Sequence, residues 1–246
     1  MKLQGRVAII TGAGGFLGRG MALRLAENGS RVMVNDVNMK TALETVKLVT
    51  SQGGEAVAHG ANVTKAEEVQ DMVGQVMDKW GKVDILVNNA GDIRDAMLTN
   101  MSEEDWDFVI NLNLKGSFLC ARAVVPQMIE RGYGKIVNIA SMSYKGNAGQ
   151  SNYSSAKAGL VGFTRALGLE LARHRINVNC IAPGLIETPR TGTLDERTRE
   201  RIIRLTPMRC MGEVNDIANA VLFFASDESK FITRQVIHVS GGMEGF

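Results

Sequence analysis

The residues best suited to chemistry begin with a glycine-rich turn near the N-terminus. Thr11-Gly12-Ala13-Gly14-Gly15-Phe16-Leu17-Gly18 follows an apolar run, and a helical pattern starts directly after it. Glycines in such a turn permit a tight reversal, let the backbone approach a pyrophosphate and let the helix pack closely on its sheet. The free N–H groups at the helix N-terminus attract phosphate. The alternative is an ordinary tight turn. The candidate dinucleotide-binding residues are Gly12, Gly15, Phe16, Leu17 and Gly18.

An acidic residue follows this turn at about the spacing of dinucleotide-binding motifs. Asp36 lies 36 − 18 = 18 residues after Gly18, at the end of the second apolar run. A carboxylate there can accept hydrogen bonds from both hydroxyls of an adenosine ribose, and it repels a 2′-phosphate. The turn and the acid together predict a dinucleotide site and favour NAD(H) over NADP(H).

A phenol and an ammonium group lie four residues apart in Tyr153-Ser154-Ser155-Ala156-Lys157, which places both on one face of a helix. Ser141 ends a predicted strand, and only a short glycine-containing loop separates it from this helix. The alternative is a solvated helix face. The nearby strand end favours a catalytic role for the tyrosine and lysine.

The elements that position these residues are short β-branched runs alternating with longer amphipathic stretches, the pattern of βαβ units. Several runs are continuously apolar, as expected for central strands covered on both faces. No linker, repeat or low-complexity tract divides the 246 residues. The pattern predicts one α/β domain, a Rossmann-type doubly wound three-layer α/β/α fold with a seven-stranded parallel sheet. The predicted strands are 6–11, 31–35, 55–59, 83–88, 135–140, 176–181 and 235–239.

Composition excludes several other classes of protein. With 28 Lys and Arg against 26 Asp and Glu, the formal net charge is +2, which is small for nucleic-acid binding because phosphate neutralisation needs clustered cations. The longest apolar run, 220–225, is far below the roughly 18 residues of a membrane helix. Cys120, Cys180 and Cys210 are widely separated, which predicts free thiols and no metal site. We therefore expect a cytoplasmic protein without metal, membrane or nucleic-acid partner.

Taken in order along the chain, these motifs resemble the short-chain dehydrogenase/reductase superfamily, in its single-domain branch. The resemblance covers essentially the whole chain and implies one NAD(P)-binding domain over 1–246, with a mobile substrate lid around 188–211. Its motifs are the glycine turn, Asn88-Asn89-Ala90-Gly91, Asn113-Leu114-Lys115-Gly116, Ser141, Tyr153 with Lys157, and Pro183-Gly184 followed by Thr188.

The resemblance implies a catalytic set of Asn113, Ser141, Tyr153 and Lys157. Tyr153 exchanges a proton with the substrate oxygen while hydride moves to or from a nicotinamide, and Ser141 hydrogen-bonds the same oxygen. Lys157 holds the nicotinamide ribose, and Asn113 anchors a water connected to Lys157. Lowering a phenol pKa from about 10 by roughly three units requires about 4 kcal/mol, which a nearby cation helps to supply. Ser143 is the alternative serine, because the interval from Ser141 to Tyr153 is one residue shorter than is common.

The resemblance also implies further cofactor contacts. Thr188 contacts the nicotinamide carboxamide, and Asn62 stands where many relatives have an aspartate beside the adenine. For Asn88 we expect a structural role, tying neighbouring strands together. Beyond the glycine turn and Asp36, the expected cofactor residues are Asn62, Val63, Asn89, Ala90, Gly91, Tyr153, Lys157, Pro183, Gly184, Ile186 and Thr188.

One departure keeps other functions open. The single-domain branch usually spaces its turn T-G-x-x-x-G-x-G, whereas Phe16 occupies the penultimate glycine position here and Gly15 precedes it. This spacing resembles the extended branch that includes nucleotide-sugar epimerases and dehydratases, although the chain length and Pro183-Gly184 argue against that branch. A second alternative is a non-catalytic NAD-binding partner subunit of an active paralogue.

The lid carries several arginines. Arg197 and Arg201 are expected to be unpaired on one helix face, with Arg190 and Arg209 flanking them. Because guanidinium suits phosphate, they are candidates to bind the phosphates of coenzyme A; the alternative is a solvated helix face. The ion pairs predicted on the same helix are Asp195 with Arg199 and Glu200 with Arg204.

The segments 177–184 and 207–242 are similar to 3-oxoacyl-thioester reductases and related secondary-alcohol dehydrogenases. Members that act on acyl carrier protein usually prefer NADPH and use basic residues near the entrance, which Arg131, Arg173 and Arg175 match loosely. Asp36 favours NAD. We therefore expect an NAD-dependent dehydrogenase of a small secondary alcohol, with a 3-hydroxyacyl or 3-oxoacyl thioester of coenzyme A as the leading substrate.

The resemblance also implies a homotetramer, built through the helices that carry Asn113 and Tyr153 and through the C-terminal segment. Phe223, Phe224 and Phe246 near the C-terminus fit burial in such an interface, and core packing explains the first two equally well.

Overall fold

Seven strands form a single parallel sheet in the computed structural model, which describes residues 1–189, 191–193 and 195–245. The strands are β1 (Val7–Ile10), β2 (Arg31–Asn35), β3 (Glu55–His59), β4 (Ile85–Asn88), β5 (Gly134–Ile139), β6 (Ile176–Pro183) and β7 (Val236–Val239). Their order is β3-β2-β1-β4-β5-β6-β7. All seven predicted strands are confirmed, with small shifts at their ends. Arg190 and Phe246, to which the sequence assigned roles, lie outside the described residues.

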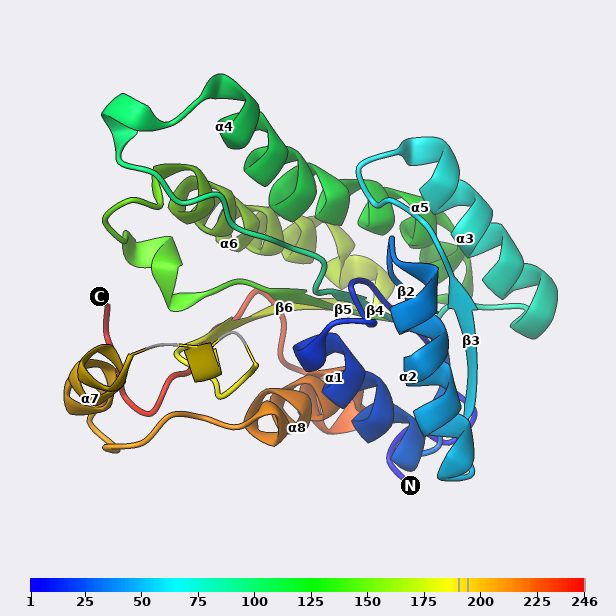
Figure 1. Ribbon diagram of the computed structural model, residues 1–246. Helices are drawn as coiled ribbons and strands as arrows, with labels where there is room; N and C mark the ends of the chain where they lie inside the picture. Colours follow the sequence, from blue (N-terminus) through cyan, green and yellow to red (C-terminus); the bar gives the residue numbers. More distant parts are fainter. Residues whose placement is uncertain (190, 194, 246) are drawn as a thin grey trace.

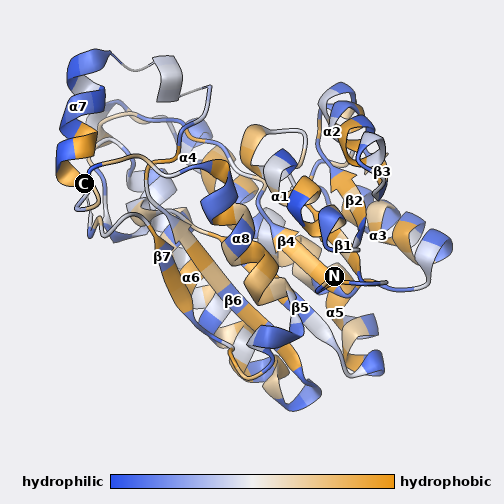
Figure 2. Ribbon diagram, turned by 90° about the horizontal axis from the view of Figure 1, so that it is seen from below, coloured by the Kyte–Doolittle hydropathy of each residue, from blue (hydrophilic) through white to orange (hydrophobic). Residues whose placement is uncertain are grey.

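Helices cover both faces of the sheet (Figure 1). The helices α1 (Phe16–Glu27), α2 (Met39–Ser51) and α8 (Val214–Ala225) pack on one face, and α3 (Ala66–Trp80), α5 (Gly116–Arg131) and α6 (Ser151–Leu171) pack on the other. Figure 2 shows the central strands in the hydrophobic colour, as burial between two helical layers requires. The predicted three-layer doubly wound fold is confirmed.

The order of the strands reverses at β1, which lies between β2 and β4. Both neighbours are parallel to β1, with Ile10 opposite Val34 on one side and Val87 on the other. In a doubly wound sheet the connections leave β1 and β4 toward opposite faces, so a crevice opens at their carboxyl ends. The glycine turn and the segment after β4 therefore meet at this crevice.

The helix α4 (Glu103–Ile110) continues through a π-helical turn at Asn111–Lys115 into α5. The continuous run Glu103–Arg131 is long and apolar enough to cross a membrane by length and composition alone. Its buried side chains, including Leu119 and Val124, belong to the core cluster on the face of the sheet that α3, α5 and α6 cover. Packing on the sheet thus accounts for its apolar face, and the π turn places Asn113 toward the crevice.

A cluster of charges closes the opposite end of the sheet, before β4. The fully buried Asp84 carboxylate accepts hydrogen bonds from Val7 N at 2.9 Å, from Lys82 Nζ at 3.0 Å and from Arg131. Burial raises the pKa of this carboxyl, but the hydrogen bonds from Arg131, Lys82 and Val7 outweigh it and hold the pKa below its ordinary value. Asp84 therefore stays ionised and links three segments of the chain.

Replacing Asp84 with asparagine is expected to lower the free energy of unfolding by on the order of 3 kcal/mol, because Arg131 and Lys82 lose their shared counter-charge. Since the folded-state pKa is depressed, this stabilisation is present above about pH 4 and is lost as the pH falls through the folded-state pKa. Urea unfolding of both proteins at neutral and acidic pH measures it. Asp78→Asn, on the exposed face of α3, is the control, and equal stability of the two variants contradicts the prediction.

Candidate functional site

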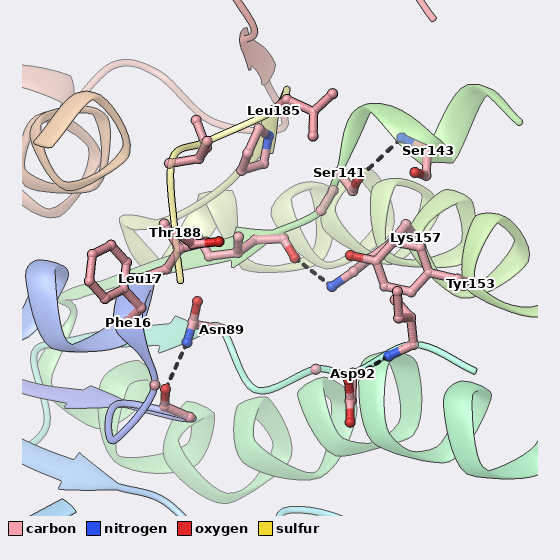
Figure 3. Close-up of a pocket in the computed structure, with 18 of the residues that line it drawn as sticks. Phe16, Leu17, Asn89, Asp92, Ser141, Ser143, Tyr153, Lys157, Leu185 and Thr188 are labelled. Atoms are coloured by element: carbon pink, nitrogen blue, oxygen red, sulfur yellow. Dashed lines mark hydrogen bonds between the residues drawn. The ribbon is translucent and has the colours of Figure 1, made fainter. Parts of the chain in front are cut away.

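A cleft of about 960 Å³ lies at the carboxyl ends of the central strands. Figure 3 shows side chains from the glycine turn, the segment after β4, the serine loop, α6 and the segment after β6 converging on it. Sixteen of the residues expected in the site line this cleft. They are Gly12, Gly15, Phe16, Leu17, Gly18, Asp36, Asn89, Ala90, Gly91, Ser141, Tyr153, Lys157, Pro183, Gly184, Ile186 and Thr188.

At two glycines of the turn, a side chain would collide with neighbouring backbone atoms. Gly12 has a φ of +63°, and a Cβ there would lie 2.9 Å from Ala90 Cα. A Cβ at Gly18 would lie 2.4 Å from the Gly12 carbonyl oxygen. Helix α1 begins at Phe16 with no side-chain cap, so the N–H groups of its first turn have no partner within the helix. This arrangement fits a pyrophosphate, as the sequence predicts.

Asp36 also lines the cleft, and hydrogen bonds from the backbone fix the orientation of its carboxylate. Its two oxygens accept hydrogen bonds from Gly14 N at 3.0 Å and Asn38 N at 2.9 Å. The nearest arginine of the turn, Arg19, is engaged with the Gly14 carbonyl at 3.3 Å and with Glu44 at 3.3 Å. Within the described ranges no cation pairs with Asp36, so no ion pair offsets the charge of this carboxylate beside the cleft.

Asn89 and Thr11 join the two strand ends across the crevice. Thr11 Oγ1 accepts from the backbone N–H groups of Asn89 and Ala90, each at 3.0 Å, and Asn89 Nδ2 donates to the Thr11 carbonyl at 2.9 Å. Asn88 Nδ2 donates to Asn138 Oδ1 of β5 at 2.8 Å. The structural role expected for Asn88 is thereby confirmed.

Lys157 lies next to Tyr153, and both side chains line the cleft (Figure 3). The lysine is only 3% exposed, its Nζ donates to the Ile139 carbonyl at 2.9 Å, and it lies 5.4 Å from the centroid of the Tyr153 ring. Burial lowers the pKa of Lys157 to about 8. At pH 7 the ammonium is therefore mostly protonated and places a positive charge beside the phenol.

Asn113 lies behind Gly91, held by the π turn. Its Nδ2 donates to the carbonyls of Asp92 and Val109, both at 2.9 Å, while its buried Oδ1 has no partner in the described part of the chain. A Cβ at Gly91 would come within 2.4 Å of that Oδ1 and 3.5 Å of Lys157 Nζ. An unpaired acceptor beside Lys157 fits the water-anchoring role that the resemblance implies.

The two candidate serines differ in what their hydroxyl groups can do. Ser141 Oγ accepts from Ser143 N at 3.2 Å, which leaves the Ser141 proton free to donate to a substrate oxygen. Ser143 Oγ donates its own proton to Gln150 Oε1 at 2.9 Å. Geometry therefore favours Ser141 as the serine that binds the reacting oxygen.

Asn62 and Val63 are not among the described residues that line the cleft. Asn62 Oδ1 accepts from Thr64 N at 3.0 Å and Thr64 Oγ1 at 2.8 Å, so it shapes a turn. Val63 is buried, and a Cβ at Gly116 would lie 2.8 Å from Val63 Cγ2. These contacts give both residues a packing or turn role that the motif pattern did not reveal, and their contacts with a cofactor stay a prediction.

Many residues that line the cleft were not predicted from the sequence. Some of these residues continue motifs already recognised, since Asp92 follows Gly91 directly and Gln150 precedes Tyr153 by three positions; that adjacency was the available signal. The cleft-lining residues not expected in the site are Asp92, Ile93, Asp95, Ile139, Ala140, Asn147, Gln150, Leu185, Pro189, Thr191 and Ile202.

The segment 188–211, predicted to be a substrate lid, contains helix α7 (Glu196–Leu205), of which Ile202 lines the cleft. The Asp195 side chain caps this helix by accepting a hydrogen bond from Thr198 N at 2.9 Å, and Arg199 pairs with Glu187. The predicted pairing of Asp195 with Arg199 was therefore wrong, and among the described residues Glu200 does not pair with Arg204 either. Arg197 and Arg201 are exposed, so their binding to phosphate stays a prediction.

Sequence comparison agrees with the fold and the site. A family model described as enoyl-(acyl carrier protein) reductase matches residues 12–244. The (2S)-[(R)-hydroxy(phenyl)methyl]succinyl-CoA dehydrogenase subunit BbsD of Thauera aromatica is 47% identical over 246 residues, covering 100% of this chain and 99% of that protein. The 3-oxoacyl-[acyl-carrier-protein] reductase FabG of Thermotoga maritima is 43% identical over 244 residues, covering 99% of each chain.

Two solved structures share the fold over nearly their full length. One is described as a gluconate dehydrogenase from Agrobacterium tumefaciens, with a TM-score of 0.96, 33% identity and coverage of 100% of this chain and 98% of that one. The other is described as a short-chain dehydrogenase/reductase from Burkholderia xenovorans, with a TM-score of 0.95, 37% identity and coverage of 98% and 97%. The fold and the site define an oxidoreductase that binds a nicotinamide cofactor. The chain belongs to the short-chain dehydrogenase/reductase superfamily.

Proposed function

We propose that this protein is an NAD(H)-dependent oxidoreductase that interconverts the secondary alcohol and the ketone of a 3-hydroxyacyl or 3-oxoacyl thioester, with coenzyme A as the leading carrier. The observation that supports it most is the convergence of Ser141, Tyr153 and Lys157 on one cleft that Asp36 also lines. The names of the two curated relatives combine an acyl thioester with a hydroxyl or oxo group, which supports the substrate class.

Each catalytic residue has a separate role in the proposed reaction. The nicotinamide, when bound, supplies or accepts the hydride. In the reductive direction Tyr153 gives its phenolic proton to the ketone oxygen, and in the oxidative direction it takes the proton from the alcohol. Ser141 donates a hydrogen bond to the same oxygen and holds it in place. Lys157 lowers the cost of the phenolate through its positive charge, and Asn113 offers Oδ1 to the path by which that proton is replaced.

The proposal is tested by a screen that follows NADH and NADPH absorbance. The substrates are 3-hydroxybutyryl-CoA, acetoacetyl-CoA, simple secondary alcohols and sugars, each with both cofactors. Reduction of acetoacetyl-CoA with NADH supports the proposal. Tightly retained NAD without net NADH formation supports the epimerase alternative instead. Because the T. aromatica relative is described as a subunit, an isolated chain that is inactive until a paralogous subunit is added supports the partner-subunit alternative.

Asp36→Ser is expected to lower the preference for NAD over NADP by about tenfold to a hundredfold, because it removes the negative charge that repels a 2′-phosphate. The ratio of kcat/KM with the two cofactors measures this change. The exposed Asp78→Ser serves as the matched control for loss of a carboxylate. An unchanged ratio in Asp36→Ser shows that another group sets cofactor choice.

We further propose that the protein assembles as a homotetramer. Trp106, Phe108, Phe118 and Ile129 leave a large part of their apolar surface exposed on α4 and α5, and Leu169 does so on α6. Grouped exposed apolar side chains commonly mark protein interfaces. Near the C-terminus Phe224 is buried in the core, whereas Phe223 keeps exposed surface, so of these two phenylalanines Phe223 is the one available to an interface.

A further inference from the structure

A chain of hydrogen-bonded side chains on the substrate side of the cleft has no part in the proton transfer. It comprises Asp95 from the segment after β4, Gln150 at the N-terminal end of α6 and Ser143 in the short 3₁₀ turn η3 (Met142–Lys145), and all three line the cleft. Gln150 Nε2 donates to Asp95 Oδ2 at 3.0 Å, and Ser143 Oγ donates to Gln150 Oε1 at 2.9 Å. Asn147 Nδ2 donates to the same Oε1 at 3.0 Å.

Asp95 fixes the direction of every hydrogen bond in this chain. An ionised carboxylate only accepts hydrogen bonds, so the amide nitrogen of Gln150 must face Asp95 and its amide oxygen must face Ser143. That amide oxygen also only accepts, so the Ser143 proton is committed to Gln150. Gln150 is 9% exposed and Ser143 4%, so water competes little for these contacts. The lone pairs of Ser143 Oγ are then left as acceptors toward the cleft.

The two serines of the loop therefore have opposite polarity, and Figure 3 shows them side by side at the cleft. Ser141 accepts from the protein, through Ser143 N at 3.2 Å, and keeps its proton for the substrate. Ser143 gives its proton to the protein and keeps its lone pairs. We propose that Ser143 is a specificity-determining residue that accepts a hydrogen bond from the substrate, and that Asp95 is a positioning residue that sets this polarity through Gln150.

This inference rests on the proposed function for the identity of the donor. A 3-hydroxyacyl thioester of a pantetheine carrier has one donor at the reacting carbon, which Ser141 and Tyr153 engage. The next donor along the molecule is the amide N–H two carbons beyond the sulphur, and coenzyme A and acyl carrier protein share it. Ser143 accepts from this N–H. A substrate without it leaves a buried acceptor unpaired, which lowers kcat/KM by about tenfold to a hundredfold.

The test compares kcat/KM for acetoacetyl-N-acetylcysteamine and for its N-methyl analogue, which lacks the N–H. The wild type is expected to prefer the N–H thioester by at least about tenfold. In Ser143→Ala the ratio falls to near one, while Ser143→Thr keeps the preference because it keeps the hydroxyl group. Asp95→Asn lowers the ratio, because an amide at position 95 can present its N–H as well as its oxygen and so no longer fixes which way the Gln150 amide faces. Asp95→Glu keeps the carboxylate and the preference.

The outcomes separate this inference from the function on which it rests. A preference that persists in Ser143→Ala reflects the bulk of the N-methyl group and overturns the inference while leaving the function intact. Wild-type turnover of neither thioester with either cofactor overturns both. NADH titration and thermal melting report whether each variant is folded, and a purely structural role of Asp95 would change the melting temperature without changing the ratio. Because both carriers present the same amide N–H, Ser143→Ala should lower kcat/KM for acetoacetyl-CoA and for acetoacetyl carrier protein alike, and the wild-type kcat/KM values identify the preferred carrier.

Discussion

Tyr153→Phe is expected to lower kcat by about a thousandfold, the scale of a lost general acid or base, while the affinity for NADH changes by less than about threefold. The substitution removes the phenolic oxygen and keeps the ring. The ring centroid of Tyr153 lies 5.4 Å from Lys157 Nζ, and Lys157 keeps its hydrogen bond to the Ile139 carbonyl in the variant. Cofactor binding should therefore survive when proton transfer is lost.

Steady-state rates with acetoacetyl-CoA and fluorescence titration with NADH measure these two effects separately. Tyr144→Phe is the matched control, since Tyr144 lies in the turn η3 before α6, bonds to His238 Nε2 at 2.9 Å and is not among the described residues that line the cleft. It should retain most of the activity. A Tyr153→Phe enzyme that keeps more than a few per cent of wild-type kcat excludes the phenol as the acid and base.

The parts of the site that the sequence predicted are those recorded in short, continuous stretches of chain. The glycine turn, Asp36 and the pairing of Tyr153 with Lys157 each depend on one turn or one helix face, and the strands that carry them show as continuous apolar runs. Parallel strands align their carboxyl ends, so residues that follow those strands meet at one edge. Local pattern and fold class together were enough to place these residues around one cleft.

The hydrogen-bonded chain from Asp95 to Ser143 was not predicted, because it depends on side chains that are distant in sequence. Asp95 and Gln150 are 55 residues apart and meet only because β4 and β5 are neighbours in the sheet. Nothing in the local pattern around Asp95 distinguishes it from a solvated loop carboxylate. Residues such as Asp95 and Gln150 were therefore missed, whereas most of the residues predicted to bind the cofactor line the cleft; their contacts with a cofactor stay a prediction.

In the segment 188–211 the prediction of ion pairs failed for a second reason, because several local interactions compete for the same side chain. Asp195 and Arg199 have the spacing of a helical ion pair, but a helix start offers an aspartate unpaired N–H groups as well. In the structure Asp195 caps α7 through Thr198, and Arg199 turns to Glu187, 12 residues earlier. Spacing alone does not decide between these partners, since each is worth about 1 kcal/mol or less.

Lys157→Met is expected to inactivate the enzyme and yet to make the folded chain more stable. Burial lowers the pKa of Lys157 from 10.5 to about 8, and this difference corresponds to about 3 kcal/mol of unfavourable burial at pH 7. Methionine avoids that cost but leaves the Ile139 carbonyl unpaired, at about 1 kcal/mol. The free energy of unfolding should therefore rise by about 2 kcal/mol at pH 7, while kcat falls because the phenolate loses its neighbouring charge.

The pH dependence separates this explanation from a simple gain in packing. The folded-state pKa of Lys157 lies below the unfolded value, so the cost of burying its charge is full below pH 8. As the pH rises from about 8 toward 10.5 the folded chain loses the proton first, and the wild type gains stability relative to its unfolded state. Urea unfolding without cofactor at several pH values should show the advantage of Lys157→Met shrinking over this range. The exposed Lys47→Met on α2 should show no such trend. A Lys157→Met protein less stable than the wild type at pH 7 would mean that the buried ammonium stabilises the fold, and that activity is not maintained at the expense of stability at this position.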